Sequence, residues 1–453
     1  MLKKFDIIII GSGGGSKITR PAAALGYHVA IIDHGPLGGT CLNRGCIPSK
    51  MLIHVADVIH EIKTAKNVYI DNDTRVNVDV PSLVQHVSDT VDAESQSINP
   101  MYEANDNITL YTETARFLSN KVIQVGTDEI TADKIFICAG GRPFIPEITG
   151  LKNTPYWTST EALRAKTLPK SLIILGGGYI AVELGYYFQG LGVDVTFVIR
   201  NQMIKDEDDE IIHIFKEEFG KNHRLIFGCE ASAVSYDNQL FNVVLTDKTE
   251  LQAEQLLVAT GIQPNSDVLD IKNTDIQCDN AGFITVNKQL ETHVPNIYAF
   301  GDIIRPYQFR HSANFEGQYL FDHVVKQNDD TPIKYAPVPH AIFTNPQVAG
   351  VGLTERECKR LKRGYYCGKN WYKDSAMGMA LKSENDFVKL IFDSDTHELI
   401  GAHIIGKEAA TMIHMCILAM SLKATHHDLV SMIYIHPALP EVIRNAARNA
   451  KIK

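Results

Sequence analysis

Residues 5–16 read FDIIII-GSGGGS, an apolar strand that runs directly into a glycine-rich turn. Four consecutive isoleucines are typical of a parallel strand that is buried on both faces. A glycine-rich turn lets the backbone approach a pyrophosphate, which the N-terminus of the following helix then faces. The stretch therefore predicts the first strand, turn and helix of a doubly wound α/β unit that binds a dinucleotide.

The small residues of this turn have separate expected roles. Gly11 makes the tight turn and Gly13 allows the close approach, while Ser16 replaces the third glycine and is small enough to keep the helix near the strand. Asp33 ends the next apolar run, Val29–Ile32, where a carboxylate can accept hydrogen bonds from the ribose hydroxyls. One such loop is weak evidence because structural turns look alike, but a second copy occurs downstream.

The second copy covers residues 171–181, SLIIL-GGGYIA, and again joins an apolar strand to a glycine turn. Both copies are followed by similar closing segments, AGGRP at residues 139–143 and ATGIQP at residues 259–264. The repeat predicts two tandem dinucleotide-binding units. The first unit is enlarged by a helical, polar stretch between about residues 51 and 97.

The strand Val195–Ile199 bears on which dinucleotide binds to the second unit. It ends without an acid for a ribose 2′-hydroxyl, and Arg200 follows, which favours NADPH over NADH because a guanidinium attracts the 2′-phosphate. A solvated loop arginine is the alternative interpretation. The acidic run Asp206–Glu210 opposes a phosphate if it faces the coenzyme, or else begins a helix.

Composition narrows the class of protein. The 453 residues carry 44 Lys and Arg against 53 Asp and Glu, a formal charge of −9, which argues against nucleic-acid binding. No apolar run approaches the ~18 residues of a membrane span. Eight cysteines are ordinary cytosolic usage, so we expect a cytoplasmic protein without a membrane segment.

The segment at residues 38–50 reads GGTCLNRGCIPSK and places Cys41 and Cys46 five residues apart. It closely resembles the redox motif of the class I pyridine nucleotide–disulfide oxidoreductases, and within that family it is most similar to dihydrolipoamide dehydrogenases. The resemblance spans nearly the whole chain, through Gly301-Asp302, Phe343-Thr344-Asn345-Pro346 and His436-Pro437. It implies an enzyme with FAD, a nicotinamide coenzyme and a redox-active disulfide.

The resemblance implies a role for each residue of the redox site. Cys41 exchanges with the substrate and Cys46 faces the flavin. Lys50 lies beside flavin N5 with Glu183 as its carboxylate partner, and Asp302 holds the ribityl chain. The cofactor-binding residues that the motifs and the resemblance imply are Gly11, Gly13, Ser16, Asp33, Gly39, Thr40, Lys50, Gly140, Gly301 and Asp302 for FAD, and Gly176, Gly178, Tyr179, Ala181, Arg200 and Gly261 for the nicotinamide coenzyme.

The implied fold is α/β, with two doubly wound dinucleotide-binding (Rossmann-like) domains and a C-terminal α+β dimerisation domain. Residues 1–146 and 265–330 are expected to form the FAD-binding domain, residues 147–264 the NAD(P)-binding domain, and residues 331–453 the dimerisation domain. The stretch Ala409–Leu422 is apolar on nearly every face, which predicts that it is buried at an interface.

The motif HPALPE at residues 436–441 supplies a base and its orienting acid. Thiol–disulfide exchange needs a base that makes a thiolate at neutral pH, and His436 suits this, with Glu441 fixing its tautomer. In the family this pair reaches the cysteines of the other subunit. The resemblance thus implies an obligate homodimer with shared active sites.

Two substrate types stay open. The redox segment and residues 343–346 favour a dihydrolipoamide dehydrogenase, which oxidises a lipoyl-carrier substrate. Ser16, Tyr179 and Arg200 are more similar to glutathione and mycothione reductases, which reduce a small disulfide with NADPH. Mercuric reductases and the larger thioredoxin reductases need a further cysteine pair that residues 449–453 lack. A catalytically idle flavoprotein subunit is the alternative from another class, but it should have lost a redox cysteine or the histidine.

Overall fold

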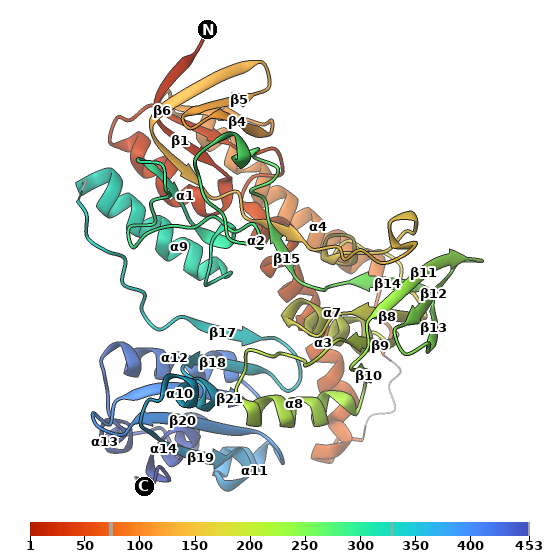
Figure 1. The fold of residues 1–453 in the computed structure, drawn as a ribbon. Helices are drawn as coiled ribbons and strands as arrows, with labels where there is room; N and C mark the ends of the chain where they lie inside the picture. The colour runs from red at the N-terminus through yellow and green to blue at the C-terminus, as the bar shows by residue number, and fades with distance from the viewer. Residues whose placement is uncertain (72–75, 328, 452–453) are drawn as a thin grey trace. The chain divides into compact units, whose positions relative to one another are not determined.

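The computed structural model describes residues 1–71, 76–327 and 329–451, and it confirms the predicted α/β class (Figure 1). The chain forms two compact units. The first comprises Met1–Ser49, Pro81–Ile145 and Gly261–Lys334, and the second comprises Lys50–Val80, Pro146–Thr260 and Tyr335–Lys453. The second unit contains most of both later predicted domains, and the division into three domains stays a prediction. Residues 72–75 of the predicted helical stretch lie outside the described residues.

The first unit is built around a mainly parallel sheet in the order β3-β2-β1-β6, with β16 beside β6 and an antiparallel extension β5-β4. Ile7 to Ile10 pair with β2 on one side and with β6 on the other, and all four are buried. The continuous isoleucine run is therefore the central strand of the sheet. The strands are β1 (Lys3–Ile10), β2 (Val29–Ile32), β3 (Ile108–Tyr111), β4 (Ala115–Ser119), β5 (Val122–Val125), β6 (Asp128–Ile137) and β16 (Ile297–Ala299), and a separate pair β7 (Gly141–Pro143) and β15 (Ile262–Pro264).

Helix α1 (Ser12–Ala24) follows β1 directly and lies beside α9 (Arg310–Tyr319), as Figure 1 shows. The two helices are in close contact, because a Cβ added to Gly317 would lie 3.1 Å from the carbonyl oxygen of Gly14. The remaining helices of this unit are α2 (Gly39–Arg44), α4 (Val80–Gln96), which begins one residue before the unit's second segment, α5 (Ile98–Glu103), η3 (Ile271–Asn273), η4 (Gly301–Ile303) and the π-helix η5 (Leu320–Gln327).

The second unit contains a four-stranded parallel sheet in the order β10-β9-β8-β14 and a three-stranded antiparallel sheet β11-β12-β13. The strands are β8 (Ser171–Leu175), β9 (Asp194–Ile199), β10 (Arg224–Phe227), β11 (Ala231–Asp237), β12 (Leu240–Leu245), β13 (Glu250–Ala253) and β14 (Gln255–Val258). The helices are η1 (Ala65–Val68), η2 (Leu151–Asn153), α6 (Ser159–Ala162), α7 (Tyr179–Gly190) and α8 (Asp209–Gly220). Helix α3 (Cys46–Thr64) begins in the first unit and continues into the second.

A five-stranded antiparallel sheet, β17-β18-β21-β20-β19, makes up the C-terminal part of the second unit. Apolar residues of β20 pack with helices α12 and α14 into one core. The strands are β17 (Pro339–Ile342), β18 (Val348–Gly352), β19 (Tyr365–Trp371), β20 (Phe387–Asp393) and β21 (Leu399–Ile405), and the helices are α10 (Glu355–Leu361), η6 (Tyr372–Asp374), α11 (Ala376–Ala380), α12 (Ala409–Ser421), α13 (His426–Ser431) and α14 (Pro440–Arg448). Across the part of the chain that the structure describes, no helix has both the length and the apolar character that crossing a membrane requires.

Candidate active site

The first glycine turn forms a backbone cradle. Gly11 has a φ of 108°, and a Cβ there would lie 2.3 Å from the carbonyl oxygen of Cys138, so only glycine fits. A Cβ on Gly39, at the start of α2, would lie 2.7 Å from the Cα of Gly13. Two stretches of bare backbone thus meet at the N-terminus of α1, the arrangement that suits a pyrophosphate.

Gly15, the residue before Ser16, lies close to the strand that precedes the turn. A Cβ on Gly15 would lie 2.5 Å from the Cγ2 of Ile9, whereas the Ser16 hydroxyl donates a hydrogen bond to the carbonyl of Gly13 at 2.9 Å. The role predicted for Ser16, to keep the helix near the strand, stays a prediction. Its hydroxyl additionally ties down the turn itself.

Asp33 links this turn to the segment that leads to the cysteines. Its carboxylate accepts hydrogen bonds from the backbone N–H and the hydroxyl of Ser12, at 2.8 and 2.6 Å. The Ser12 hydroxyl also accepts the N–H of Gly38 at 2.8 Å. The predicted ribose-binding acid therefore holds the two halves of the cradle together through Ser12.

The redox segment brings its two cysteines into contact. Cys41 lies half-buried on α2, and Cys46 is the exposed first residue of α3. A hydrogen bond joins the two thiols, and this bond together with burial raises the pKa of the Cys41 thiol, while Arg310 acts to lower it. Two thiols in hydrogen-bonding contact are placed to exchange a disulfide for a dithiol.

Lys50, one turn after Cys46 on α3, is held by a carboxylate from another helix. Its Nζ lies 2.6 Å from an Oε2 of Glu183 on α7, and 4.6 Å from the ring centroid of Phe343. The other oxygen of Glu183 accepts the backbone N–H of Phe343 at 3.0 Å. Three segments far apart in the sequence thus fix one cation.

The first unit contains buried polar atoms that suit FAD. Among the described residues, Asn43 Oδ1, Ser312 Oγ and Asn314 Oδ1 are buried without a hydrogen-bond partner from the protein. Asp302 lies in η4, where burial raises the pKa of its carboxyl and Arg310 acts against that rise. Gly140 and Gly301 both have positive φ, at 66° and 74°. Together with the glycine cradle, these groups fit a flavin dinucleotide.

The second glycine turn repeats the geometry of the first. Gly176 has a φ of 127°, and a Cβ there would lie 2.2 Å from the carbonyl oxygen of Ala259. Gly178 precedes α7, on which Tyr179 is the first residue and Ala181 is buried. The N-terminus of α7 therefore fits a second dinucleotide as α1 fits the first. The predicted Gly261 has a φ of 130°.

Two of the acids after β9 point away from solvent. Asp208 accepts the N–H of Glu210 and caps α8, so the run begins a helix. Glu207 is fully buried, accepts the Tyr179 hydroxyl at 2.7 Å and contacts His340 Nε2 at 2.9 Å. Arg200, in contrast, is exposed, and its guanidinium lies 3.4 Å from the exposed carboxylate of Glu230.

His436 and Glu441 form the expected pair at the start of α14. His436 Nδ1 lies 3.2 and 3.1 Å from the two carboxylate oxygens, and the imidazole is 72% exposed. Burial alone would raise the pKa of the Glu441 carboxyl, but the N–H of Ala438, His436 and Arg444 together hold that pKa below its ordinary value. An ionised Glu441 therefore orients the imidazole and leaves Nε2 for chemistry.

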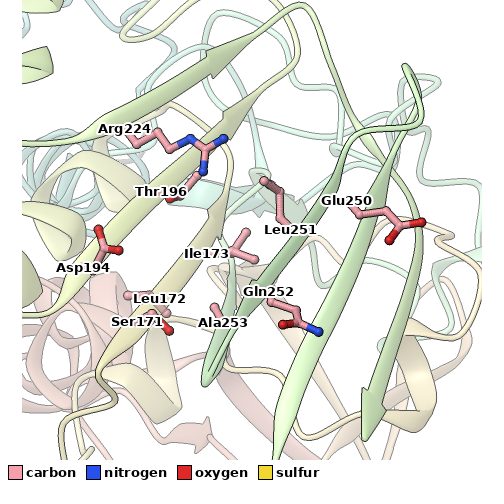
Figure 2. A pocket seen from close by; sticks show the side chains of 10 residues that line it. All are labelled: Ser171, Leu172, Ile173, Asp194, Thr196, Arg224, Glu250, Leu251, Gln252 and Ala253. Atoms are coloured by element: carbon pink, nitrogen blue, oxygen red, sulfur yellow. The ribbon is translucent and has the colours of Figure 1, made fainter.

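A cavity of about 140 Å³ lies elsewhere in the second unit (Figure 2). It is lined by the first residues of β8, β9 and β10, including Ser171, Asp194 and Arg224, and by strand β13. These are the amino ends of the parallel strands, whereas dinucleotides bind at the carboxyl ends. The cavity is thus separate from the glycine turn that precedes α7.

Sequence reasoning missed three residues of the first unit: Ser12, Asn43 and Arg310. Ser12 and Asn43 lie within quoted motifs, but the Ser12 hydroxyl meets Gly38 only when the α2 segment packs against α1, and Asn43 folds back onto the carbonyl of Leu37. Arg310 offers a signal in the sequence, because a cation at the first position of a helix opposes the helix dipole. Recognising it requires knowing where α9 begins.

Comparisons with known proteins agree with one another. The family described as pyridine nucleotide-disulphide oxidoreductase matches residues 5–317, and its dimerisation domain matches residues 338–447. The chain is 34% identical to mycothione reductase of Mycobacterium tuberculosis strain H37Rv, covering 98% of this chain and 99% of that protein. It is 31% identical to dihydrolipoyl dehydrogenase of Haloferax volcanii, covering 98% and 96%.

A solved structure shows a similar fold. The HOCl-induced flavoprotein disulfide reductase RclA from Escherichia coli matches with a TM-score of 0.86 and 25% sequence identity, covering 98% of this chain and 99% of that chain.

Proposed function

The chain belongs to the pyridine nucleotide-disulphide oxidoreductases, flavin enzymes that use FAD and NAD(P)H, and from that premise we propose that it moves electrons between NAD(P)H and a small thiol or disulfide through Cys41 and Cys46. The observation that carries the proposal is the contact between these two thiols. They lie on α2 and at the start of α3, directly after the glycine cradle at Gly13 and Gly39.

Bound FAD supplies the two-electron relay between the nicotinamide and the cysteines. The chain's own residues open and close the disulfide. As NAD(P)H is oxidised to NAD(P)⁺, the Cys41–Cys46 bond breaks to give one thiol and one thiolate. The cation of Lys50, fixed by Glu183, stabilises negative charge that develops at this end of α3.

His436 is proposed to move the proton of the thiol substrate. The imidazole is exposed, and Glu441 holds its Nδ1, so Nε2 accepts a proton and later returns it. Leu422, Ile433 and Ile435 are also strongly exposed, although they are apolar. Such a surface is expected to be covered in the homodimer that the dimerisation domain supports. We propose that His436 thereby serves the cysteines of the partner.

We propose that the coenzyme is NADPH and that the substrate is a small disulfide. Arg200 follows β9 where the adenosine ribose is expected, and its ion pair with Glu230 is exposed and therefore weak. A 2′-phosphate, with its larger charge, can replace Glu230 as partner. The buried position of Glu207 and Asp208 removes two of the acids that would repel it.

Oxidation of dihydrolipoamide is the second candidate. The observation that favours it is the redox segment at residues 38–50, which is most similar to dihydrolipoamide dehydrogenases. It would use the same cysteines and the same base in the opposite direction, with NAD⁺ as electron acceptor.

Anaerobic mixing of the FAD-loaded protein with NADPH or NADH, followed by the flavin absorbance, tests the choice. The account predicts fast flavin reduction by NADPH and slower reduction by NADH at equal concentration. Fast reduction by NADH alone would instead favour the dihydrolipoamide assignment. Failure of both coenzymes to reduce the flavin would contradict the proposed function altogether.

A further inference from the structure

The segment that follows β9, residues 200–208, packs against the second glycine turn. The backbone N–H of Ile204 donates a hydrogen bond to the carbonyl of Gly177 at 2.8 Å, and a Cβ on Gly177 would lie 3.3 Å from the Cα of Met203. Ile204 is buried and has a φ of 39°, a strained conformation for a β-branched residue. Such strain persists only where the surrounding structure holds it, so contacts beyond Ile204 must keep the segment in place.

A buried carboxylate fastens this segment to the first residue of α7. Glu207 is fully buried, and its Oε1 accepts the hydroxyl of Tyr179 at 2.7 Å. Tyr179 directly follows Gly178 at the N-terminus of α7, the helix end that is expected to face the pyrophosphate of the coenzyme. Arg200, proposed to bind the 2′-phosphate, begins the same segment as Glu207. One side chain thus joins the two elements that are proposed to hold the coenzyme.

His340 of β17 is the partner of the buried carboxylate. Its Nε2 lies 2.9 Å from Oε2 of Glu207, and its ring stacks with the ring of Tyr179 at a centroid separation of 6.1 Å. His340 pairs with Gly350 of β18, where a Cβ would lie 2.5 Å from Nε2. The glycine therefore leaves room for the imidazole. A carboxylate buried without a partner is strongly unfavourable, so Glu207 requires His340.

We propose that Glu207 and His340 are positioning residues for the coenzyme: their buried ion pair holds Tyr179, and with it the first turn of α7, in the geometry that binds the dinucleotide. The inference rests on the proposed function, because it needs a coenzyme at the second glycine turn. Asp33 has a comparable part at the first turn, where Ser12 donates to its carboxylate. Asp33 follows β2 directly, whereas the acid that holds the second turn comes from further along the chain after β9.

Protonation of His340 sets the pH range in which the ion pair forms. Burial acts to lower the pKa of the imidazole, but Glu207, Asp206 and Glu357 raise it above its ordinary value of about 6.5. The pair of imidazolium and carboxylate is therefore complete below this raised pKa, and it is lost as the pH rises through it. Coenzyme binding should weaken in the same direction.

The other titratable groups near His340 do not replace it in this role. Those on the neighbouring elements are Tyr179 on α7, Asp206 and Glu207 before α8, Glu357 on α10, His403 on β21, and His414 and Cys416 on α12. Burial lowers the pKa of His403 and raises that of Cys416, so both are neutral at pH 7. His414 is exposed to solvent. The charged groups that raise the pKa of His340 are carboxylates.

The test measures coenzyme binding to the FAD-loaded protein as a function of pH. Isothermal titration calorimetry gives the Kd for NADP⁺ between pH 6.5 and 9, with the flavin oxidised and no turnover. We expect the Kd of the wild type to rise about tenfold as His340 loses its proton. Glu207→Gln should bind as tightly as the wild type does at low pH and should lose this rise. Its neutral amide can accept the Tyr179 hydroxyl and donate to a neutral imidazole at every pH.

Two further variants remove the contact with Tyr179 altogether. Glu207→Leu keeps an apolar side chain of similar size in the buried position, and Tyr179→Phe removes only the hydroxyl. Each should raise the Kd about tenfold at pH 7. In stopped-flow reduction by NADPH, the half-saturating concentration should rise by the same factor while the limiting rate is kept, because the pair acts on binding. Tyr179→Phe leaves the ion pair in place, so it reports even if Glu207→Leu fails to fold.

His323→Gln is the matched control. His323 Nδ1 also lies 3.0 Å from a carboxylate, that of Asp329, but it belongs to η5 of the first unit. Its replacement should leave the Kd and the pH dependence unchanged. FAD content and thermal unfolding are recorded for each variant to identify loss of folding. An unchanged Kd in Tyr179→Phe, or a pH dependence in Glu207→Gln equal to that of the wild type, would overturn the assignment.

The wild-type protein separates this proposal from the function beneath it. The titrations use NAD⁺ if the wild type binds it more tightly than NADP⁺. If neither coenzyme binds to the wild type and neither reduced form reduces its flavin, the proposed function is wrong. If coenzyme binds and reduces the flavin while Tyr179→Phe and Glu207→Leu behave as the wild type does, only the proposal for Glu207 and His340 fails.

Discussion

The two glycine turns have the same backbone but different surroundings. In each, a glycine of positive φ lies so near a carbonyl oxygen that a Cβ would come within 2.3 Å at Gly11 and 2.2 Å at Gly176. The strand after the first turn ends at Asp33, which is held by the turn itself. The strand after the second ends beside the exposed Arg200.

We infer from this difference that each turn provides the backbone for a dinucleotide, and that the neighbouring residues determine which dinucleotide binds. The first turn lies beside α2 and α9, which bring Cys41 and Arg310 toward it. The second has an exposed cation at the end of its strand. We interpret the first as the site of a cofactor that stays bound, and the second as the site of a coenzyme that enters and leaves at each turnover.

The largest effects should come from adding one methyl group to each turn. Gly11→Ala should yield protein that lacks stoichiometric FAD, because the Cβ collides with the carbonyl of Cys138. The Gly176→Ala variant should keep FAD. Its flavin should be reduced about 100-fold more slowly at low NADPH concentration, because about 3 kcal/mol of backbone strain weakens NADPH binding. FAD absorbance and anaerobic stopped-flow measure the two effects.

The chain offers a matched control in each unit. Gly26 and Gly192 also have positive φ, at 90° and 93°, but a Cβ there would meet nothing within 4 Å. Alanine at these positions should lower thermal stability and leave both dinucleotides bound. Equal loss of FAD in the Gly11→Ala and Gly176→Ala variants would contradict the assignment of FAD to the first turn alone.

The effect of His436→Gln should fall on one half-reaction only. Loss of the base should slow the reaction with the thiol or disulfide substrate by about 100-fold or more. Flavin reduction by NADPH should keep its rate, because the imidazole takes no part in it. Rapid mixing of the protein with NADPH, and separately with the thiol or disulfide substrate, measures the rate of each half-reaction. Slower flavin reduction by NADPH in the variant would mean that His436 also acts in the coenzyme half-reaction.

The smallest effects concern the end of β9. Arg200→Ala should raise the KM for NADPH about tenfold and leave that for NADH nearly unchanged. Glu230→Gln should lower the KM for NADPH about twofold, because it frees Arg200 from a weak exposed pair. Steady-state kinetics with both coenzymes gives the ratio of the KM for NADH to the KM for NADPH. No change in that ratio for either variant would mean that Arg200 does not bind the 2′-phosphate.

The sequence predicts best what is encoded locally. The isoleucine run predicts the central strand of the first unit, and the glycine spacing predicts both turns, because strand burial and turn geometry depend on neighbours in the chain. The α/β class and the enzyme family are confirmed. The pairing of Lys50 with Glu183, 133 residues apart, follows only from the family resemblance.

The rest depends on tertiary packing. The position of Ile9 decides that Gly15 must lack a side chain, which the predicted fingerprint of Gly11, Gly13 and Ser16 does not include. The sequence pattern predicts Glu207 to be a surface acid. In the structure Glu207 is buried and contacts His340 of β17. Arg310 lies beside Gly13 only because α9 packs there, and no spacing in the sequence reveals this packing.

Differential labelling of the cysteines tests whether Cys41 and Cys46 form a redox-active pair. The protein is purified in air and treated with an alkylating reagent before and after anaerobic reduction by NADPH, and each peptide is identified by mass spectrometry. The account predicts that Cys41 and Cys46 are protected before reduction and labelled together after it, with no such change at the buried Cys138 or Cys416. Equal labelling of Cys41 and Cys46 before and after reduction would contradict a redox role for the pair.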